Sequence, residues 1–162
     1  MWKVALDVGL DHPQPQGLET EIRIYVPNSS ISYSECAKAD LEKAQRGFAE
    51  ALTEDEGDAI IENASDDIRV YRSGQLPVVG KTAAKKLLSN QDAKTTRTPR
   101  GAGTSNPTDL AYEYGDFASK RDDVTQRGIY LCIWQLESDG AWKITLDLQK
   151  SAPTEQRHVD AE

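Results

Sequence analysis

Apolar side chains recur at helical spacing in the first half of the chain and alternate with polar ones in the second half. The helical spacing predicts three helices, over residues 39–52, 57–64 and 81–90. Ser32 and Glu35 have the spacing of a capping box, so the first helix can begin before residue 39. Thr53 and Glu56 repeat that spacing and are expected to open the second helix.

Alternation of apolar and polar residues predicts four strands, over residues 66–74, 109–117, 127–136 and 141–148. Asp139 and Gly140 separate the last two strands, and an Asp-Gly pair is a strong hairpin signal. Residues 91–108 are rich in Thr, Gly, Pro and Asn, so we expect a loop there with at most one irregular strand. Helices followed by hairpin-connected strands are typical of an α+β fold with the helices on one face of an antiparallel sheet.

The composition fits one globular domain and narrows the range of partners. The chain has 162 residues, of which 38% are hydrophobic and 28% charged, and a net charge of -8. Neither nucleic acid nor an anionic membrane is an expected partner, because both attract basic surfaces. No apolar run approaches the ~20 residues that cross a bilayer, and no signal peptide is visible, which favours the cytoplasm without fixing the compartment.

The positions of histidine and cysteine exclude several kinds of chemistry. His12 and His158 lie near the two ends, so the body of the domain has no imidazole for a Ser-His or Cys-His pair or for a histidine metal site. Cys36 and Cys132 match no metal spacing and are expected to be free thiols, with a disulfide as the alternative. We expect no metal and no cofactor, and any acid-base chemistry must use carboxylates, tyrosines, lysine or arginine.

Seven short sequence words follow one another in a recognisable order: F-x-x-AL, GD, ASDDIRVYRSG, PVVGKTAA, DLAYEYG, G-x-YLCIW and DGAWKITLD. Over residues 37–153 the chain therefore resembles the nuclear transport factor 2-like superfamily, in its SnoaL-like branch (the type called domain of unknown function 4440). The resemblance implies a strongly bent antiparallel sheet around a cone-shaped pocket, with about three helices on its concave face. The superfamily includes ketosteroid isomerases, polyketide cyclases, dehydratases and members that only bind or associate, so the fold leaves the function open.

The residues that the isomerase relatives use for catalysis are absent at the matching positions. Where the resemblance places a general-base aspartate the chain has Arg72, which stays protonated and cannot take up a proton. Phe48 occupies the position of a helix tyrosine that holds the oxyanion, and it has no hydroxyl. The strand over residues 127–136 carries no acid to replace the third element. Ketosteroid isomerase chemistry is therefore not expected.

Aromatic residues and one arginine are the candidates for a ligand pocket: Phe48, Tyr71, Arg72, Tyr112, Tyr114, Tyr130 and Trp134. The alternative is that they are ordinary core and sheet-face residues, which strands favour. An inward-facing Arg72 would need an anion, either a ligand carboxylate or one of Asp66, Asp67, Glu113 and Asp116; a solvent-facing side chain is the third possibility. Asp66 and Asp67 are neighbours at a helix-to-strand turn, so we expect a turn or cap role for them.

The final hairpin predicts which face of the sheet is buried. If Leu136 pairs with Trp142, one face carries Tyr130, Cys132, Trp134, Leu136, Trp142, Ile144, Leu146 and Leu148, and packs on the helices. The opposite face then carries Ile129, Leu131, Ile133, Lys143, Thr145 and Asp147. Three aliphatic residues in a row need cover. We therefore expect a homodimer through Ile129, Leu131 and Ile133, which also matches the sheet-to-sheet dimers of the resembled superfamily.

The opening WKVALDV repeats the closing WKITLDL, and a Pro and a Gln recur at the same offsets behind both. We interpret residues 1–17 as an extra strand and linker resembling the end of a preceding copy, 18–36 as a lead-in, 37–153 as the SnoaL-like domain and 154–162 as a tail. The opening strand is expected to add to an exposed sheet edge of its own subunit or of a partner, because its apolar alternation needs cover. Chance similarity between two strands is the alternative.

Two classes of function remain. The first is a dimerising module that binds a small apolar or aromatic ligand without catalysis. The second is an isomerase, cyclase or dehydratase that uses pocket tyrosines and a carboxylate. The first is favoured, because the catalytic sets of the resembled enzymes are missing. An unpaired Asp or Glu in a closed pocket near Tyr112 or Tyr114 would favour the second.

Overall fold

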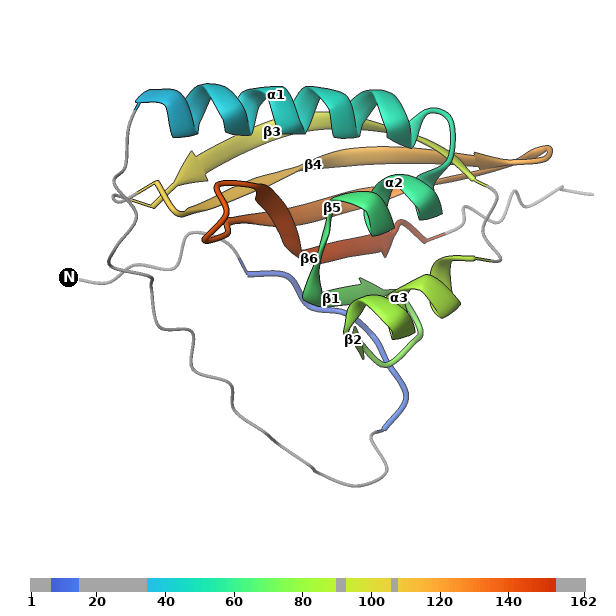
Figure 1. The fold of residues 1–162 in the computed structure, drawn as a ribbon. Helices are drawn as coiled ribbons and strands as arrows, with labels where there is room; N and C mark the ends of the chain where they lie inside the picture. The colour runs from blue at the N-terminus through green and yellow to red at the C-terminus, as the bar shows by residue number, and fades with distance from the viewer. Residues whose placement is uncertain (1–6, 15–34, 90–92, 106–107, 154–162) are drawn as a thin grey trace, which may run out of the picture.

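The computed structural model describes residues 7–14, 35–89, 93–105 and 108–153. In this part of the chain, three helices and six strands follow one another (Figure 1). The helices are α1 (Glu35–Leu52), α2 (Glu56–Asn63) and α3 (Lys81–Leu88). The strands are β1 (Ala64–Arg72), β2 (Val78–Val79), β3 (Lys94–Thr104), β4 (Leu110–Arg121), β5 (Val124–Leu136) and β6 (Trp142–Ser151).

The strands form one sheet in the order β2-β1-β6-β5-β4-β3. Strands β1 and β6 are parallel, and the other neighbouring pairs in this sheet are antiparallel. Helix α1 lies over β3, α2 contacts β6 and α3 contacts β1 (Figure 1). The expected α+β class with helices on one side of a curled sheet is confirmed, and the single parallel pair is the one departure from an antiparallel sheet.

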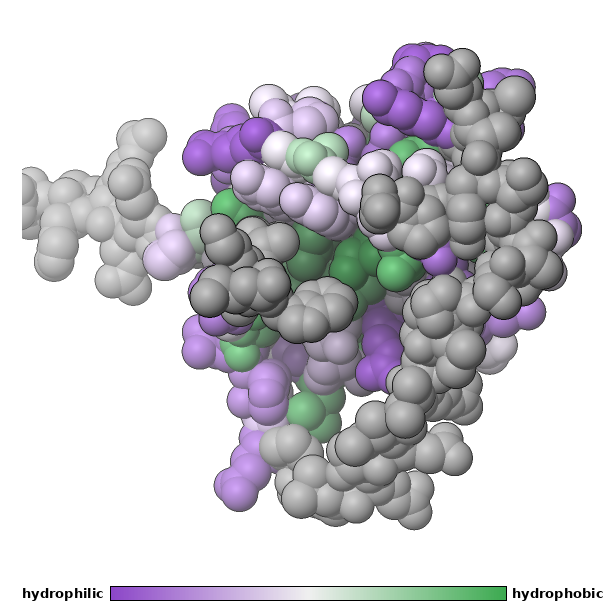
Figure 2. Space-filling model, turned by 90° about the vertical axis from the view of Figure 1, so that its left-hand side faces the viewer, coloured by the Kyte–Doolittle hydropathy of each residue, from purple (hydrophilic) through white to green (hydrophobic). Residues whose placement is uncertain are grey.

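The core fills the space between the helices and the concave face of the sheet. Its most completely buried apolar side chains include Leu52, Ile60, Ile68, Val70, Leu88, Trp134 and Ile144. Seen from one end, apolar (green) side chains lie in the middle of the molecule and polar (purple) ones surround them (Figure 2). Within the described residues, no helix is both long and apolar enough to cross a membrane.

The beginning of α2 differs from the prediction by a small shift of the cap. Asp55 is the N-cap, because its Oδ1 accepts a hydrogen bond from the Asp58 N–H at 2.7 Å. The predicted cap, Thr53, instead donates its hydroxyl to the Glu50 carbonyl at 2.8 Å. Asp55 takes the role because a cap must stand directly before the first helical residue, Glu56. Helix α1 does begin before residue 39, while Ser32 lies outside the described residues.

The loop expected over residues 91–108 is largely a strand, β3, which pairs with β4 over most of its length. A Cβ added to Gly101 would lie 2.7 Å from the ring of Tyr114, and one added to Gly103 would lie 2.7 Å from the ring of Tyr112. Each tyrosine ring therefore covers a glycine of the neighbouring edge strand, where a larger residue has no room. Glycine composition suggested a loop, but these tyrosines supply the side-chain cover that the glycines lack.

Strand β6 contains a register shift that changes which residues face the helices. The predicted pairing of Leu136 with Trp142 is confirmed, but the ladder between β5 and β6 shifts between Ile133 and Trp134. Beyond that shift, Asp147 pairs with the buried Cys132 and lies on the concave face. Leu146 and Leu148 pair with Ile133 and Leu131, so they lie on the outer face. The predicted faces of these three β6 residues are therefore wrong, because one bulged residue reverses the alternation.

Residues 7–14 form an irregular segment held against the end of β1. The Gly74 N–H donates to the Asp11 carbonyl at 2.9 Å, and Val8 and Leu10 are half-buried. These residues contain no strand, and the rest of the predicted opening strand lies outside the described residues. The predicted tail from residue 154 and most of the predicted lead-in over 18–36 also lie outside them.

Candidate functional site

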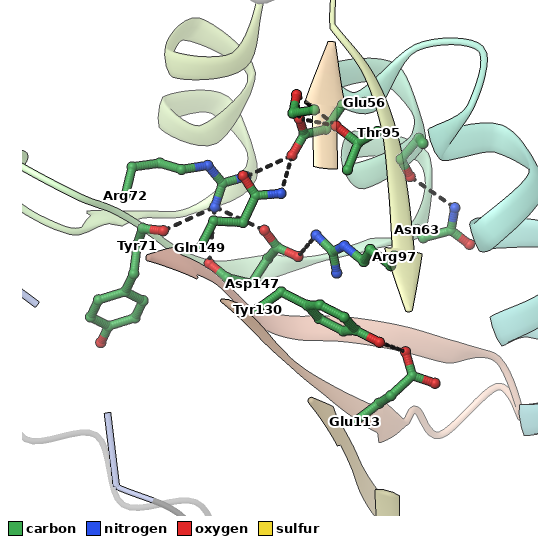
Figure 3. A network of polar contacts seen from close by, with 12 residues as sticks. Glu56, Asn63, Tyr71, Arg72, Thr95, Arg97, Glu113, Tyr130, Asp147 and Gln149 are labelled. Atoms are coloured by element: carbon green, nitrogen blue, oxygen red, sulfur yellow. Dashed lines mark hydrogen bonds and ion pairs between the residues drawn. The ribbon is translucent and has the colours of Figure 1, made fainter. Parts of the chain in front are cut away.

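Charged side chains lie in the interior of the curled sheet, where a core would normally be apolar. Asp147 of β6 has no exposed surface and lies between two arginines (Figure 3). Its Oδ2 is 2.6 Å from Arg97 Nη2, and its Oδ1 is 2.9 Å from Arg72 Nη1. Both arginine side chains are themselves more than nine-tenths buried. We refer to Arg72, Asp147 and Arg97 as the interior ion triad.

The triad joins strands that are far apart in the sheet. Arg97 belongs to β3 and Asp147 to β6, with β4 and β5 between them. In a flat sheet, three steps of about 4.8 Å would separate these strands by roughly 14 Å. The ion pair is possible because the sheet curls and brings its edge over its centre. The triad therefore ties the open edge of the cone to its middle.

Electrostatics favour the charged forms of Asp147 and Arg97. Burial by itself would raise the pKa of Asp147, but the charges of Arg97 and Arg72 outweigh it and hold the pKa below its usual value. Burial would likewise lower the pKa of Arg97, and the opposing charge of Asp147 raises it instead. An aspartate that stays ionised between two arginines is a poor proton acceptor. Asp147 is therefore not a candidate for general-base chemistry.

Two aromatic rings cover the Arg97 guanidinium. Its Cζ lies 4.7 Å from the ring centre of Tyr130 and 5.2 Å from that of Phe48. The Nε and Nη1 atoms of Arg97 are buried without a hydrogen-bond partner. Contact with the ring faces partly replaces the missing hydrogen bonds, because a cation is attracted to the negative face of an aromatic ring.

A second buried carboxylate, Glu56 at the start of α2, gathers polar side chains from four strands. Its Oε2 accepts a hydrogen bond from the Thr95 hydroxyl at 2.7 Å. Its Oε1 accepts from Gln149 Nε2 and lies 3.5 Å from Arg72 Nη2. Ser119 Oγ lies 2.8 Å from the Thr95 hydroxyl and so joins the same group. Both oxygens of Glu56 thus accept hydrogen bonds, which a buried carboxyl group needs.

A cavity of about 310 Å³ lies between α1 and the sheet. Its lining residues are Glu42, Gln45, Arg46, Phe48, Ala49, Leu52, Arg97, Pro99, Glu113 and Trp134. Phe48 and Trp134 form an aromatic wall, with ring centres 5.4 Å apart and ring planes nearly perpendicular. We refer to this space as the α1 cavity. Its size and mostly apolar wall are typical of small-molecule sites.

Glu113 is the half-buried polar group on the sheet side of the α1 cavity. One carboxylate oxygen accepts a hydrogen bond from the Tyr130 hydroxyl at 2.6 Å (Figure 3). Burial and this hydrogen bond raise the pKa of Tyr130, so the phenol stays protonated and acts as the donor. The carboxylate is thereby oriented with its second oxygen left to accept from a guest in the cavity.

The structure places four of the seven predicted pocket residues in the interior. Phe48 and Trp134 line the α1 cavity, and Tyr130 lies between Arg97 and Glu113. Arg72 faces inward, but at the other end of the cone. Its partners are Asp147 and Glu56, and neither belongs to the four acids considered from the sequence.

The other three predicted pocket residues, Tyr71, Tyr112 and Tyr114, lie on the outer face of the sheet, and their assignment to the pocket is corrected. Tyr112 and Tyr114 cover the glycines of β3. The ring of Tyr71 points away from the polar network (Figure 3). The residue between the two β4 tyrosines, Glu113, is the one that faces the cavity. A shift of one residue in the assumed orientation of a strand exchanges its two faces, and this is the cause of the error.

Comparison of the whole fold with solved structures identifies its architecture. An NTF-2-like protein of unknown function from Shewanella oneidensis MR-1 is 17% identical, with a TM-score of 0.57, over 69% of this chain and 97% of that one. A ketosteroid isomerase-like protein from Erwinia carotovora atroseptica SCRI1043 is 16% identical (TM-score 0.58; 71% and 96% covered). An LEH-like epoxide hydrolase from M. tuberculosis is 14% identical (TM-score 0.53; 70% and 79% covered). The chain thus has the nuclear transport factor 2-like fold that its sequence predicted.

Comparison by sequence adds nothing to this result. No family model matches the chain, and no curated protein matches it. Identities below 20% show the fold alone, and the structural relatives differ in their named activities. The function must therefore be inferred from the site itself.

Proposed function

We propose that this domain binds a small, mainly apolar or aromatic molecule in the α1 cavity, and that the guest donates a hydrogen bond to Glu113. The observation that carries the proposal is the oriented carboxylate of Glu113 beside the aromatic wall of Phe48 and Trp134, in a cavity of suitable volume. Phe48 and Trp134 supply ring surface for an aromatic guest. Glu113 fixes the orientation of the bound molecule, because a single hydrogen bond is enough to orient a mainly apolar guest in its cavity.

Binding is favoured over catalysis by the state of the interior acids. Asp147 is paired with two arginines, and Glu56 is surrounded by donors. Arg72 lies where the resembled isomerases have their base, and it is held in the triad. Of the two carboxylates that line the α1 cavity, Glu42 is exposed on its rim and Glu113 is half-buried and oriented by Tyr130, so a catalytic reading would have to rest mainly on Glu113. We therefore infer a binding role.

The proposal can be tested by NMR titration with two compounds that differ in one hydrogen-bond donor. The compounds are 2-naphthol and its methyl ether, and the signal is the Trp134 indole N–H, assigned with a Trp134→Phe variant. We expect 2-naphthol to shift this signal saturably and to bind at least about 10-fold more tightly than the ether, because a hydrogen bond to a charged group contributes roughly 1.5–3 kcal/mol.

Two variants identify the acceptor. Glu113→Gln keeps the shape of the side chain and its contact with Tyr130, and it should remove most of the preference for 2-naphthol. Glu42→Gln, on the exposed rim of the same cavity, should leave the preference unchanged. The proposal fails if neither compound shifts the Trp134 signal, or if Glu113→Gln binds both compounds as the wild type does.

We also propose that the outer face of the sheet forms a homodimer. Ile129 is 42% exposed, and Leu131 and Ile133 are half-buried on the same face. The register shift in β6 adds the half-buried Leu146 to this face, and the β4 tyrosines flank it; Leu148 lies on the same face but is only 7% exposed within the subunit. The apolar face is therefore wider than the three aliphatic residues predicted from the sequence. Burying one aliphatic side chain is worth roughly 1.5–3 kcal/mol, so such a face favours a second copy.

Light scattering coupled to gel filtration tests the dimer. The expected mass at micromolar concentration is about twice that of the monomer, and Leu131→Lys should return it to one chain. Lys94→Glu, a larger charge change on the exposed start of β3, is the control and should leave the mass unchanged. A monomeric wild type, or a Leu131→Lys variant that remains dimeric, would refute this interface.

A further inference from the structure

A second cavity, of about 550 Å³, opens at the opposite end of the cone. It is formed where β1, β4 and β6 end and β5 begins. Its lining residues are Glu56, Arg72, Ser73, Gln75, Ala93, Ser119, Arg121, Asp122, Val124, Thr125, Gln126, Gln149 and Ser151. Nearly all of these residues are polar, in contrast to the α1 cavity. We refer to this space as the polar cleft.

The floor of the polar cleft occupies positions that are apolar elsewhere in the molecule. Arg72, Ser119 and Gln149 follow the inward-facing positions of β1, β4 and β6, and each is at least nine-tenths buried. The next inward residues on β1 and β4 are Val70 and Phe117, which belong to the core. Apolar residues at the floor would stabilise the fold at least as well as buried polar ones. The polar residues of the floor are therefore better explained by the binding of a polar molecule than by a contribution to the stability of the fold.

Glu56 holds the floor groups in fixed orientations. It accepts hydrogen bonds from Gln149 Nε2 and from the Thr95 hydroxyl, and Thr95 in turn contacts Ser119 Oγ. The Gln149 carbonyl and the Ser119 oxygen keep lone pairs for another partner. Arg72 Nε is a buried donor without a hydrogen-bond partner at the same floor. The floor of the cleft thus offers fixed acceptors, and the amide and hydroxyl donors that a guest can reach lie at its rim, on Gln75, Gln126 and Thr125.

The charges of the polar cleft cancel. Two of its lining residues are acidic, Glu56 and Asp122, and two are basic, Arg72 and Arg121. An ion therefore gains no net attraction from this wall. The rim adds hydroxyl and amide groups, from Ser73, Gln75, Thr125, Gln126 and Ser151. Such a mixture of donors and acceptors without net charge matches a molecule whose own groups both donate and accept.

We propose that the polar cleft is a second binding site, for a neutral polyhydroxylated molecule of the size of a sugar or cyclitol. Hydroxyl groups suit the site because each can donate to Gln149 or Ser119 and accept from a neighbouring donor. The cavity volume lies within the usual range for small-molecule sites. The proposal does not depend on the guest of the α1 cavity, since Arg72 and Glu56 belong to the cleft and Phe48, Glu113 and Trp134 do not.

An NMR titration with myo-inositol and cyclohexanol tests the cleft, because the two share a carbon ring and differ in the number of hydroxyl groups. The signals are the side-chain amides of Gln149 and Gln126, each assigned by its substitution with Glu. We expect myo-inositol to shift the Gln149 signal saturably in the millimolar range, and cyclohexanol to leave it in place. Ser119→Ala should weaken the binding of myo-inositol about 5-fold or more, which corresponds to one neutral hydrogen bond.

Ser138→Ala, in the exposed turn between β5 and β6, is the matched control and should bind as the wild type does. A melting temperature close to that of the wild type shows that Ser119→Ala is folded. The proposal is overturned if the shifts grow linearly without saturation, if cyclohexanol produces the same shifts, or if Ser119→Ala binds as tightly as Ser138→Ala. None of these results bears on the Trp134 signal that tests the α1 cavity.

Discussion

Replacing Asp147 by Asn is the sharpest test of the interior ion triad. The substitution keeps the shape of the side chain but removes its charge, and it leaves Arg72 and Arg97 buried beside a neutral amide. Arg72 retains Glu56 at 3.5 Å. Asp147 is the one ion-pair partner of Arg97 within the described residues, so Arg97 bears most of the loss.

The expected loss of stability follows from the burial of the triad. Removing one partner of a buried ion pair costs about 3–5 kcal/mol, because a charge is left in the interior without compensation. For a chain of this length, each kcal/mol lowers the melting temperature by roughly 2–4 °C, so a fall of about 6–20 °C is expected. The free energy of unfolding should be measured by urea denaturation with tryptophan fluorescence as the signal.

The surface pair Arg100 and Asp116 is the matched control. Its Nε to Oδ2 distance is 2.6 Å, the same as that between Arg97 and Asp147, but the two side chains are 66% and 41% exposed. Asp116→Asn should therefore cost only about 0–1 kcal/mol. The double change Asp147→Leu with Arg97→Met should recover part of the loss, because it removes the unpaired charge together with its partner. The assigned role of burial is wrong if Asp147→Asn costs no more than Asp116→Asn.

Four further predictions follow from the same structure. The pKa of Asp147 is lowered in the folded state, so its contribution to the free energy of unfolding is complete above about pH 5 and is lost as the pH falls below its unfolded pKa of about 3.9. The difference in stability between the wild type and Asp147→Asn should therefore disappear in acid. A difference that stays constant with pH would contradict this. A Cβ on Gly115 would lie 2.1 Å from the backbone oxygen of Thr98, whereas one on Gly47 would meet nothing within 4 Å. Gly115→Ala should thus destabilise by about 1–3 kcal/mol, and Gly47→Ala, in the exposed face of α1, should stabilise by about 0.5–1 kcal/mol; the same sign of change for both would count against the close strand contact. Burial raises the pKa of the Cys132 thiol, so in a Cys36→Ser background it should react with a thiol reagent only as fast as the protein unfolds, and rapid labelling of the native protein would show the interior to be open. Finally, a 3-keto steroid should not be isomerised above the uncatalysed rate in an absorbance assay, since the sequence resemblance places Arg72 and Phe48 at the positions of the base and the oxyanion donor.

Most of the fold could be predicted from the sequence because its elements follow simple periodicities. Helix α1 and strands β4, β5 and β6 carry clear helical or alternating patterns, and the Asp139-Gly140 turn fixes the pairing of Leu136 with Trp142. Strand β3 could not be predicted in this way. Its Thr, Gly and Pro content favours a loop, and it becomes a strand through long-range pairing with β4. The two-residue spacing of Gly101 and Gly103, matched by that of Tyr112 and Tyr114, was the signal available for that pairing.

The site was less predictable because it depends on which way each side chain faces. Phe48, Arg72, Tyr130 and Trp134 were among the pocket candidates, with a solvent-facing Arg72 left open, and the structure has all four in the interior. Asp147 was assigned to the outer face because Trp142, Ile144, Leu146 and Leu148 alternate without interruption. Nothing in that pattern indicates the bulge that turns Asp147 inward. Its partner Arg97 lay in a segment expected to be a loop.

The bulge in β6 and the two arginines act on the same carboxylate, Asp147. An arginine at position 72 faces the cone and needs an anion within reach. The bulge in β6 supplies one by turning Asp147 inward, at the cost of a regular ladder. Arg97 then closes the curled edge over the same carboxylate and stacks on Phe48 and Tyr130. A carboxylate paired in this way ties the sheet together, and the two arginines hold its pKa below the usual value, so it is a poor proton acceptor. The groups left for a guest therefore lie at the two ends of the cone, where Glu113 faces the α1 cavity and Gln149 faces the polar cleft.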